Sequence, residues 1–273
     1  MNLEIILKRE RKLTDPNLIS AADCKFEPFP QSRGEGDSGP LMLATDVNAP
    51  GERYVVKSRY PEIPANEFMY HKIAAALGLH TQKARLFKNF PGCKYAVAIM
   101  FCPAAEAYSP ARRPDIDPTD YFKFLALYEI LSEADSNEIY LDGDNRVFKL
   151  DNSAAFNLDG LLMILLLKKT RSPWIRKAID EKIGKYLEAA ETQNYSILLE
   201  ILRERCGETA VNVCATEFRR FAALDLASLD EAFASLDKVY PKTVSDYLRR
   251  FLSVRQAACA KFSEANAAHP ERA

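Results

Sequence analysis

The sequence has few of the residues that build metal centres and disulfide frameworks. It contains six cysteines, none arranged as a CxxC pair, and three histidines, none spaced as paired metal ligands. These absences argue against a structural zinc site. The chain also begins without a recognisable secretory leader, so we expect the cysteines to be reduced and the protein to be cytoplasmic.

The sequence also lacks an excess of charge and a long apolar run. The formal net charge is −1, so nothing favours nucleic-acid binding through phosphate neutralisation. The most apolar run is 161–167, whereas a membrane-spanning helix needs about 20 residues. We therefore expect no direct nucleic-acid binding and no membrane span. We expect 161–167 to form a fully buried helix, because consecutive apolar residues leave no polar face.

What the sequence does contain is a change from strand-like to helical segments along the chain. A proline-rich stretch separates the two kinds of pattern. We therefore predict an α+β fold with a β-rich N-terminal lobe over 1–102, a connection over 103–118 and a mainly helical C-terminal lobe over 119–273. The expected strands are 41–45, 53–57, 83–87, 95–100, 139–141 and 147–150, and the expected helices are 66–77, 121–131 and about five beyond residue 175.

A lysine and a glutamate in the N-terminal half have the placement that phosphoryl transfer requires. Lys57 ends an apolar strand, and Glu67 follows on the first turn of the next helix. Such a pair can hold an ammonium group against nucleotide phosphates. Each residue also has a simpler explanation, because Lys57 could be a solvated strand end and Glu67 a carboxylate favoured by the helix N-terminus.

Two further segments could complete a nucleotide site. The stretch 34–39 is rich in glycine, which lets backbone N–H groups approach phosphate oxygens, although a plain surface turn has the same composition. Asp151 directly follows the apolar strand 147–150, and Asp135 lies in the loop that precedes this hairpin. Two acidic groups so placed are typical of a magnesium site.

These segments together resemble a known family. Tyr54-Val55-Val56-Lys57 and the later Asn66-Glu67-Phe68 are similar to the corresponding parts of HipA-like kinases. The segment 135–156, above all Leu150-Asp151-Asn152, resembles the catalytic hairpin of that family and of the type II phosphatidylinositol 4-kinases. The likeness covers residues 30 to 160 and leaves the C-terminal helices unassigned. It implies a two-lobed protein-kinase-like fold that uses ATP and Mg²⁺.

The resemblance also implies roles for individual residues. Lys57 would hold the phosphates with Glu67 as its partner, Asp135 would be catalytic, and Asp151 would be the main magnesium ligand. The remaining implied positions are Gly34, Gly36, Ser38 and Gly39 in the phosphate loop, Phe101 and Cys102 in the hinge that meets adenine, and Glu138 and Asn137 as further metal ligands.

The catalytic loop departs from the family pattern. The family has an Asp followed five residues later by an Asn, and counting back from Asp151 places Glu133 and Glu138 at those positions. We assign the catalytic role to Asp135, which requires a loop two residues shorter. Asp135 is followed by Ser136, where the family has Arg or His. An extra carboxylate at Glu138 could bind magnesium or repel the nucleotide.

Three interpretations therefore stay open. The chain could be an ATP- and magnesium-dependent kinase for a protein Ser/Thr or a small hydroxylated substrate. It could be a pseudokinase with the same fold and no turnover, which acts through its helical lobe on a regulatory partner protein. It could also be a helical scaffold with an unrelated β-domain, in which case Lys57 and Asp151 would lie far apart. No Gly-x-Ser-x-Gly motif supports a serine hydrolase.

Overall fold

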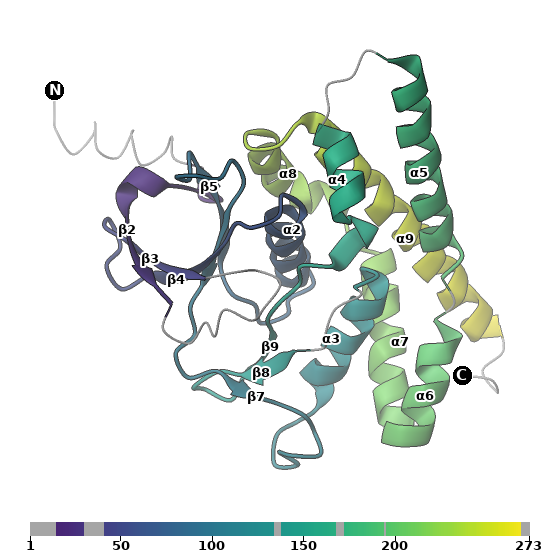
Figure 1. The fold of residues 1–273 in the computed structure, drawn as a ribbon. Coiled ribbons are helices and arrows are strands. Elements are labelled where there is room, and N and C mark those ends of the chain that lie inside the picture. The colour runs from purple at the N-terminus through teal and green to yellow at the C-terminus, as the bar shows by residue number, and fades with distance from the viewer. Residues whose placement is uncertain (1–14, 30–40, 134–137, 168–171, 194, 269–273) are drawn as a thin grey trace, which may run out of the picture.

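The computed structural model describes residues 15–29, 41–133, 138–167, 172–193 and 195–268. A curled six-stranded sheet stands on one side of the molecule and a group of helices on the other, with one helix, α2 (Glu62–Ala76), between them (Figure 1). This is the α+β, two-lobed arrangement that the sequence predicts.

The larger sheet contains the expected strand pairs and two strands that the sequence analysis missed. The strand order is β1-β5-β6-β4-β3-β2, with β1 parallel to β5 and all other neighbours antiparallel. The missed strands are β1 and β2, which are short and, in β2, mostly exposed, so they carry no clear alternation. The strands are β1 (Leu18–Ser20), β2 (Cys24–Pro28), β3 (Met42–Asp46), β4 (Arg53–Lys57), β5 (Ala84–Lys88) and β6 (Val97–Met100).

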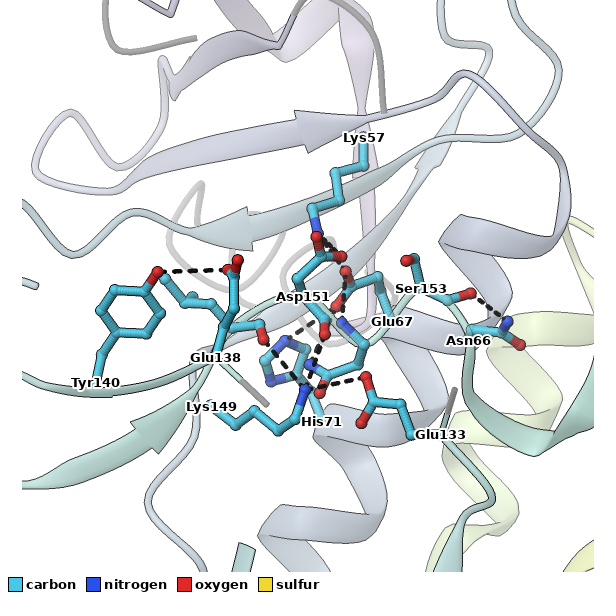
Figure 2. Close-up of polar contacts among 12 residues, drawn as sticks. Lys57, Asn66, Glu67, His71, Glu133, Glu138, Tyr140, Lys149, Asp151 and Ser153 are labelled. Carbon is cyan, nitrogen blue, oxygen red and sulfur yellow. Dashed lines mark hydrogen bonds and ion pairs between the residues drawn. The ribbon is translucent and has the colours of Figure 1, made fainter. Parts of the chain in front are cut away.

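The alternation of β4 determines where Lys57 points. Tyr54 and Val56 are buried on the inner face of the curled sheet, against Phe87. Successive side chains of a strand point to opposite faces. Lys57, the last residue of β4, therefore leaves the sheet on the side opposite Val56, where α2 lies (Figure 2).

Helix α2 is buried on nearly all sides because it packs between the sheet and the helical lobe. It ends just before Gly78, whose φ of +71° is a conformation that glycine adopts without strain. The helical lobe binds both ends of α2. The Tyr240 hydroxyl donates to the carbonyl of Pro61 at 2.8 Å, and the Arg220 guanidinium donates to the carbonyl of Leu77.

The C-terminal lobe is built from antiparallel helices and a small sheet. The predicted hairpin is present as β8 and β9, with β7 added at its edge. In the described parts of the chain, no helix is both long and apolar enough to cross a membrane. The elements are β7 (Glu106–Ala107), α3 (Thr119–Ile130), β8 (Ile139–Leu141), β9 (Val147–Lys149), α4 (Gly160–Leu167), α5 (Pro173–Glu191), α6 (Ser196–Cys206), α7 (Glu208–Ala222), α8 (Asp230–Asp237) and α9 (Lys242–Ala268).

The prediction that 161–167 is a fully buried helix is wrong. The segment is helical, but Leu161 is 58% exposed and Ile164 is 47% exposed. Helix α4 packs against α5 and α9, and the side chains that face these helices, such as Leu162 and Leu166, are the buried ones. The helix therefore has an apolar face in solvent, because α5 and α9 cover only part of its surface.

Candidate functional site

Three charged side chains from distant parts of the chain meet at one point (Figure 2). Lys57 comes from the end of β4, Glu67 from α2, and Asp151 from the loop after β9. The ammonium of Lys57 is 2.8 Å from Asp151 Oδ1 and also donates to Glu67 Oε1. The alternative of a helical scaffold with an unrelated β-domain is therefore wrong, since it required Lys57 and Asp151 to be far apart.

The burial of this cluster sets its charges. Lys57 is 8% exposed and Glu67 is fully buried, whereas the side chain of Asp151 is 32% exposed. Burial alone would lower the pKa of Lys57, but the charges of Glu67 and Asp151 outweigh it and raise that pKa. Burial would raise the pKa of Asp151, but Lys57 outweighs it and lowers that pKa. Lys57 and Asp151 therefore keep their charges at neutral pH, and the Asp151 carboxylate is partly open to solvent.

Glu67 is held from its second side by the residue after Asp151. The backbone N–H of Asn152 donates to Glu67 Oε1 at 3.0 Å, and its side-chain amide donates to Oε2 at 3.2 Å. His71, one turn further along α2, lies 3.7 Å from the same carboxylate. Burial, followed by the charge of Lys57, lowers the pKa of His71 to about 3, so this imidazole is neutral at physiological pH.

A second residue of α2 fixes the segment that follows Asp151. The Asn66 side-chain amide donates to the carbonyls of Ser153 at 2.6 Å and Leu158 at 3.3 Å. Sequence reasoning missed the roles of Asn66 and Asn152. The available signal was their position, because each is a polar residue directly adjacent to a predicted site residue.

A buried ion pair lies directly behind Asp151. Lys149, the last residue of β9, is fully buried and places its ammonium 3.0 Å from Glu133 Oε1. Burial raises the pKa of Glu133 to about 8, and Lys149 opposes that effect only in part. Glu133 is one of the two candidates for the family's catalytic Asp position. The structure buries it in a pair with Lys149 that solvent cannot reach. Sequence reasoning missed Lys149, although a lysine in an otherwise apolar strand indicates a buried ion pair or hydrogen bond.

Of the other predicted site residues, Glu138 lies within the described part of the chain, at the start of the hairpin. Glu138 is exposed and accepts a hydrogen bond from the Tyr140 hydroxyl at 3.3 Å. Its backbone carbonyl accepts from the N–H of Leu150 at 3.0 Å, which places Glu138 beside the strand that leads to Asp151. The predicted Asp135 and Asn137, and Gly34, Gly36, Ser38 and Gly39 of the phosphate loop, lie outside the described residues.

The predicted hinge follows β6. Phe101 and Cys102 are both partly exposed. The backbone N–H of Phe101 donates to the carbonyl of Arg53 at 2.8 Å, so this donor is already used. Contact of the hinge with adenine stays a prediction, and it would depend on the other backbone groups of this segment.

The described residues fit a nucleotide-bound magnesium ion better than a protein-bound metal. Within the described ranges, no group of three or more His, Cys, Asp or Glu side chains could hold a metal. Magnesium at nucleotide sites needs only one or two carboxylates, because phosphates and water complete its shell. The partly exposed Asp151 fits one such ligand, and the Lys57 ammonium beside it fits phosphate oxygens.

A cavity opens beside the segment that follows Asp151. Its volume is about 530 Å³, and Ser153 and Ala154, just after Asp151, form part of its wall. Other parts of its wall are lined by Tyr60, just before α2, by Glu62 at the start of α2, and by Asp159 and Tyr186. The cavity is large enough for a side chain or a small molecule.

Comparisons with known proteins show the fold. No protein-family model matches the chain, and no curated protein matches it. A crystal structure of a Helicobacter pylori proinflammatory kinase, CtkA, has a TM-score of 0.58 at 13% identity, and the match covers 86% of this chain and 95% of that chain. A Shewanella oneidensis HipA in complex with HipB and operator DNA has a TM-score of 0.45 at 10% identity, and the match covers 96% of this chain and 71% of that chain. The match to CtkA therefore shows a likeness of fold, in agreement with the two-lobed kinase-like fold that the sequence predicts.

Proposed function

Because the chain has the fold of a kinase, we propose that it binds ATP with magnesium and transfers a phosphoryl group to a protein Ser/Thr or a small hydroxylated substrate. The observation that supports this is the contact of Lys57 with both Glu67 and Asp151. Kinases require a lysine held by a helix carboxylate and a metal-binding aspartate at one point. These three residues come together from β4, α2 and the loop after β9.

Each residue has a defined task in this proposal. Glu67 keeps the Lys57 ammonium in place, because its carboxylate is fixed by Asn152 as well. Lys57 would exchange its contact with the partly exposed Asp151 carboxylate for a phosphate oxygen, which frees Asp151 for the metal. Bound ATP would supply the phosphoryl group, and Mg²⁺ would neutralise its charge. The cavity lined by Ser153 and Tyr60, next to the segment that follows Asp151, would give an acceptor room.

A second candidate is a pseudokinase that binds nucleotide or a partner protein without turnover. The observation that favours it is the state of the two glutamates at the family's Asp and Asn positions. Glu133 is sealed in a pair with Lys149, and Glu138 is exposed and bonded to Tyr140. Glu133 cannot orient an acceptor hydroxyl in this arrangement, so the catalytic role would fall to Asp135.

Thermal unfolding with ATP tests whether the chain binds nucleotide or only has a kinase-like fold. We expect millimolar ATP with magnesium to stabilise the chain by about 2.7 kcal/mol at a hundredfold excess over Kd. Asp151→Asn should reduce the magnesium-dependent part of that gain. Glu231→Gln on α8, an exposed site, is the matched control for loss of one carboxylate. If ATP and magnesium give no shift, the nucleotide-binding proposal is wrong.

Turnover is measured separately. Transfer of the terminal phosphate of ATP to the protein itself or to a mixture of Ser/Thr peptides, followed by mass spectrometry, distinguishes the two candidates. Phosphorylation that is lost in Asp151→Asn supports the kinase. Nucleotide binding without any transfer, in the wild type and across the peptide mixture, supports the pseudokinase.

A further inference from the structure

The backbone of Asp151 has a conformation that needs support. Its φ is +55°, in the left-handed region. A residue with a side chain adopts this region at a cost, because its Cβ approaches the following carbonyl. Glycine avoids this cost because it has no Cβ, but aspartate does not. Surrounding contacts must therefore hold the chain at this position.

Lys149 supplies those contacts. Its ammonium donates to the carbonyl of Asp151 at 2.9 Å and to the carbonyl of Leu150 at 3.3 Å. The third partner is the carboxylate of Glu133 at 3.0 Å. The N–H of Asn152 is fixed by Glu67. The peptide groups on both sides of the Asp151 Cα are thus held by charged, buried partners.

The burial of this pair excludes direct contact with a ligand. The side chains of Lys149 and Glu133 are both fully inaccessible to solvent. Neither group can reach a nucleotide or metal that approaches the exposed Asp151 carboxylate. Their effect on such a ligand must pass through the backbone of Asp151.

We propose that Lys149, held by Glu133, is a positioning residue that fixes the left-handed backbone of Asp151 and thereby aims its carboxylate at the metal–nucleotide complex. The inference rests on the proposed function for what Asp151 binds. The backbone support itself is a property of the free protein and is tested without nucleotide.

The variant to use is Lys149→Met with Glu133→Gln. A single change leaves one buried group without its partner and could prevent folding, whereas the double change leaves no uncompensated charge. Glu217→Gln is the matched control, because it also removes a buried carboxylate from an ion pair, with Arg220 on α7. The control should lose stability without any effect on Asp151.

The first measurement is amide hydrogen exchange of the free proteins. In the double variant, residues 150–153 should exchange about tenfold faster than in the Glu217→Gln control, after correction for global stability. Unchanged exchange over 150–153 would overturn the proposal, whatever the protein binds.

The second measurement is a magnesium titration of ATP binding. Loss of a residue that orients a metal ligand typically weakens metal affinity by about 10- to 100-fold. The double variant should show that loss, while ATP binding without magnesium stays as in the wild type because Lys57 and Glu67 are intact. Equal magnesium dependence in the double variant would overturn the proposal. A wild type that binds no ATP refutes the proposed function instead, and the exchange result then decides on the positioning role alone.

Discussion

Two lysines contact Asp151, and they do so in opposite ways. Each ends a strand, Lys57 in β4 and Lys149 in β9, and each pairs with a buried glutamate. Lys57 binds the carboxylate of Asp151, whose side chain is partly open to solvent. Lys149 binds the backbone carbonyl of the same residue and is sealed from solvent.

The difference separates a replaceable contact from a permanent one. A carboxylate at the surface can leave its lysine when phosphate and metal arrive, because both groups then gain new partners. The buried Lys149 ammonium cannot exchange its partners in this way, since removing them would leave a buried charge unpaired. Lys57 should therefore matter most for binding, and Lys149 most for stability.

Lys149→Met should give the largest loss of stability. Lys149 donates to Glu133 and to the carbonyls of Leu150 and Asp151, and each buried acceptor left without a donor costs about 1–3 kcal/mol. Glu133 would lose the cation that opposes the rise of its pKa. Urea unfolding at pH 7 measures the loss. A cost below that of Lys57→Met would contradict the assignment of the two roles.

Lys57→Met should instead abolish most of the nucleotide-linked stabilisation. That gain is about 2.7 kcal/mol at a hundredfold excess over Kd. The free protein should lose less stability than Lys149→Met does, because Glu67 keeps the two donors of Asn152 and Asp151 is near solvent. Thermal unfolding with and without ATP and magnesium measures both effects. A variant that still shifts fully with ATP would remove Lys57 from the site.

His71 gives the cluster a pH dependence. Its pKa is about 3 in the folded protein and near 6.5 when unfolded, so below pH 6.5 the unfolded chain binds a proton that the folded protein does not. Stability should therefore fall as the pH falls, by about 1.4 kcal/mol for each pH unit. Urea unfolding at pH 7, 6 and 5 should show a shallower slope in His71→Gln. Parallel slopes would mean that His71 is already charged when folded.

Tyr240→Phe should give the smallest effect. The hydroxyl of Tyr240 donates to Pro61 at the start of α2, and losing one such hydrogen bond costs about 1 kcal/mol. Because α2 carries Glu67, the change should weaken ATP binding slightly and leave the Lys149 pair intact. Hydrogen exchange at 150–153 provides the check, since faster exchange there would mean that α2 supports both lysines.

Much of the fold follows from local patterns. The β3–β4 and β8–β9 hairpins and helix α2 were predicted because alternation, helical spacing and the turn residues between them agree. Strands β1 and β2 were not, since β1 is very short and β2 is mostly exposed, so both are defined by their pairing partners rather than by their own residues. The exposure of Leu161 was missed for a related reason, because an apolar run does not say which neighbours are present to cover it.

The site was predictable only as far as residue type and order could indicate it. Lys57, Glu67 and Asp151 were named together because each ends or begins a recognisable element, and the structure brings them into contact. The pairing of Lys149 with Glu133 could not be read in the same way. It depends on how α3 packs against β9, which brings Glu133, just after α3, beside Lys149, and no local pattern encodes that packing.

The position of α2 has a consequence for how the protein unfolds. Its side chains are covered by the sheet on one side and by the helical lobe on the other, and Arg220 and Tyr240 bind its two ends. Neither half of the chain alone could cover all the apolar side chains of α2. A fragment cut within 103–118 would leave α2 with an apolar flank in water and no partner for it. The two lobes should therefore melt in a single cooperative transition, and separately expressed halves should recover structure only when they are mixed.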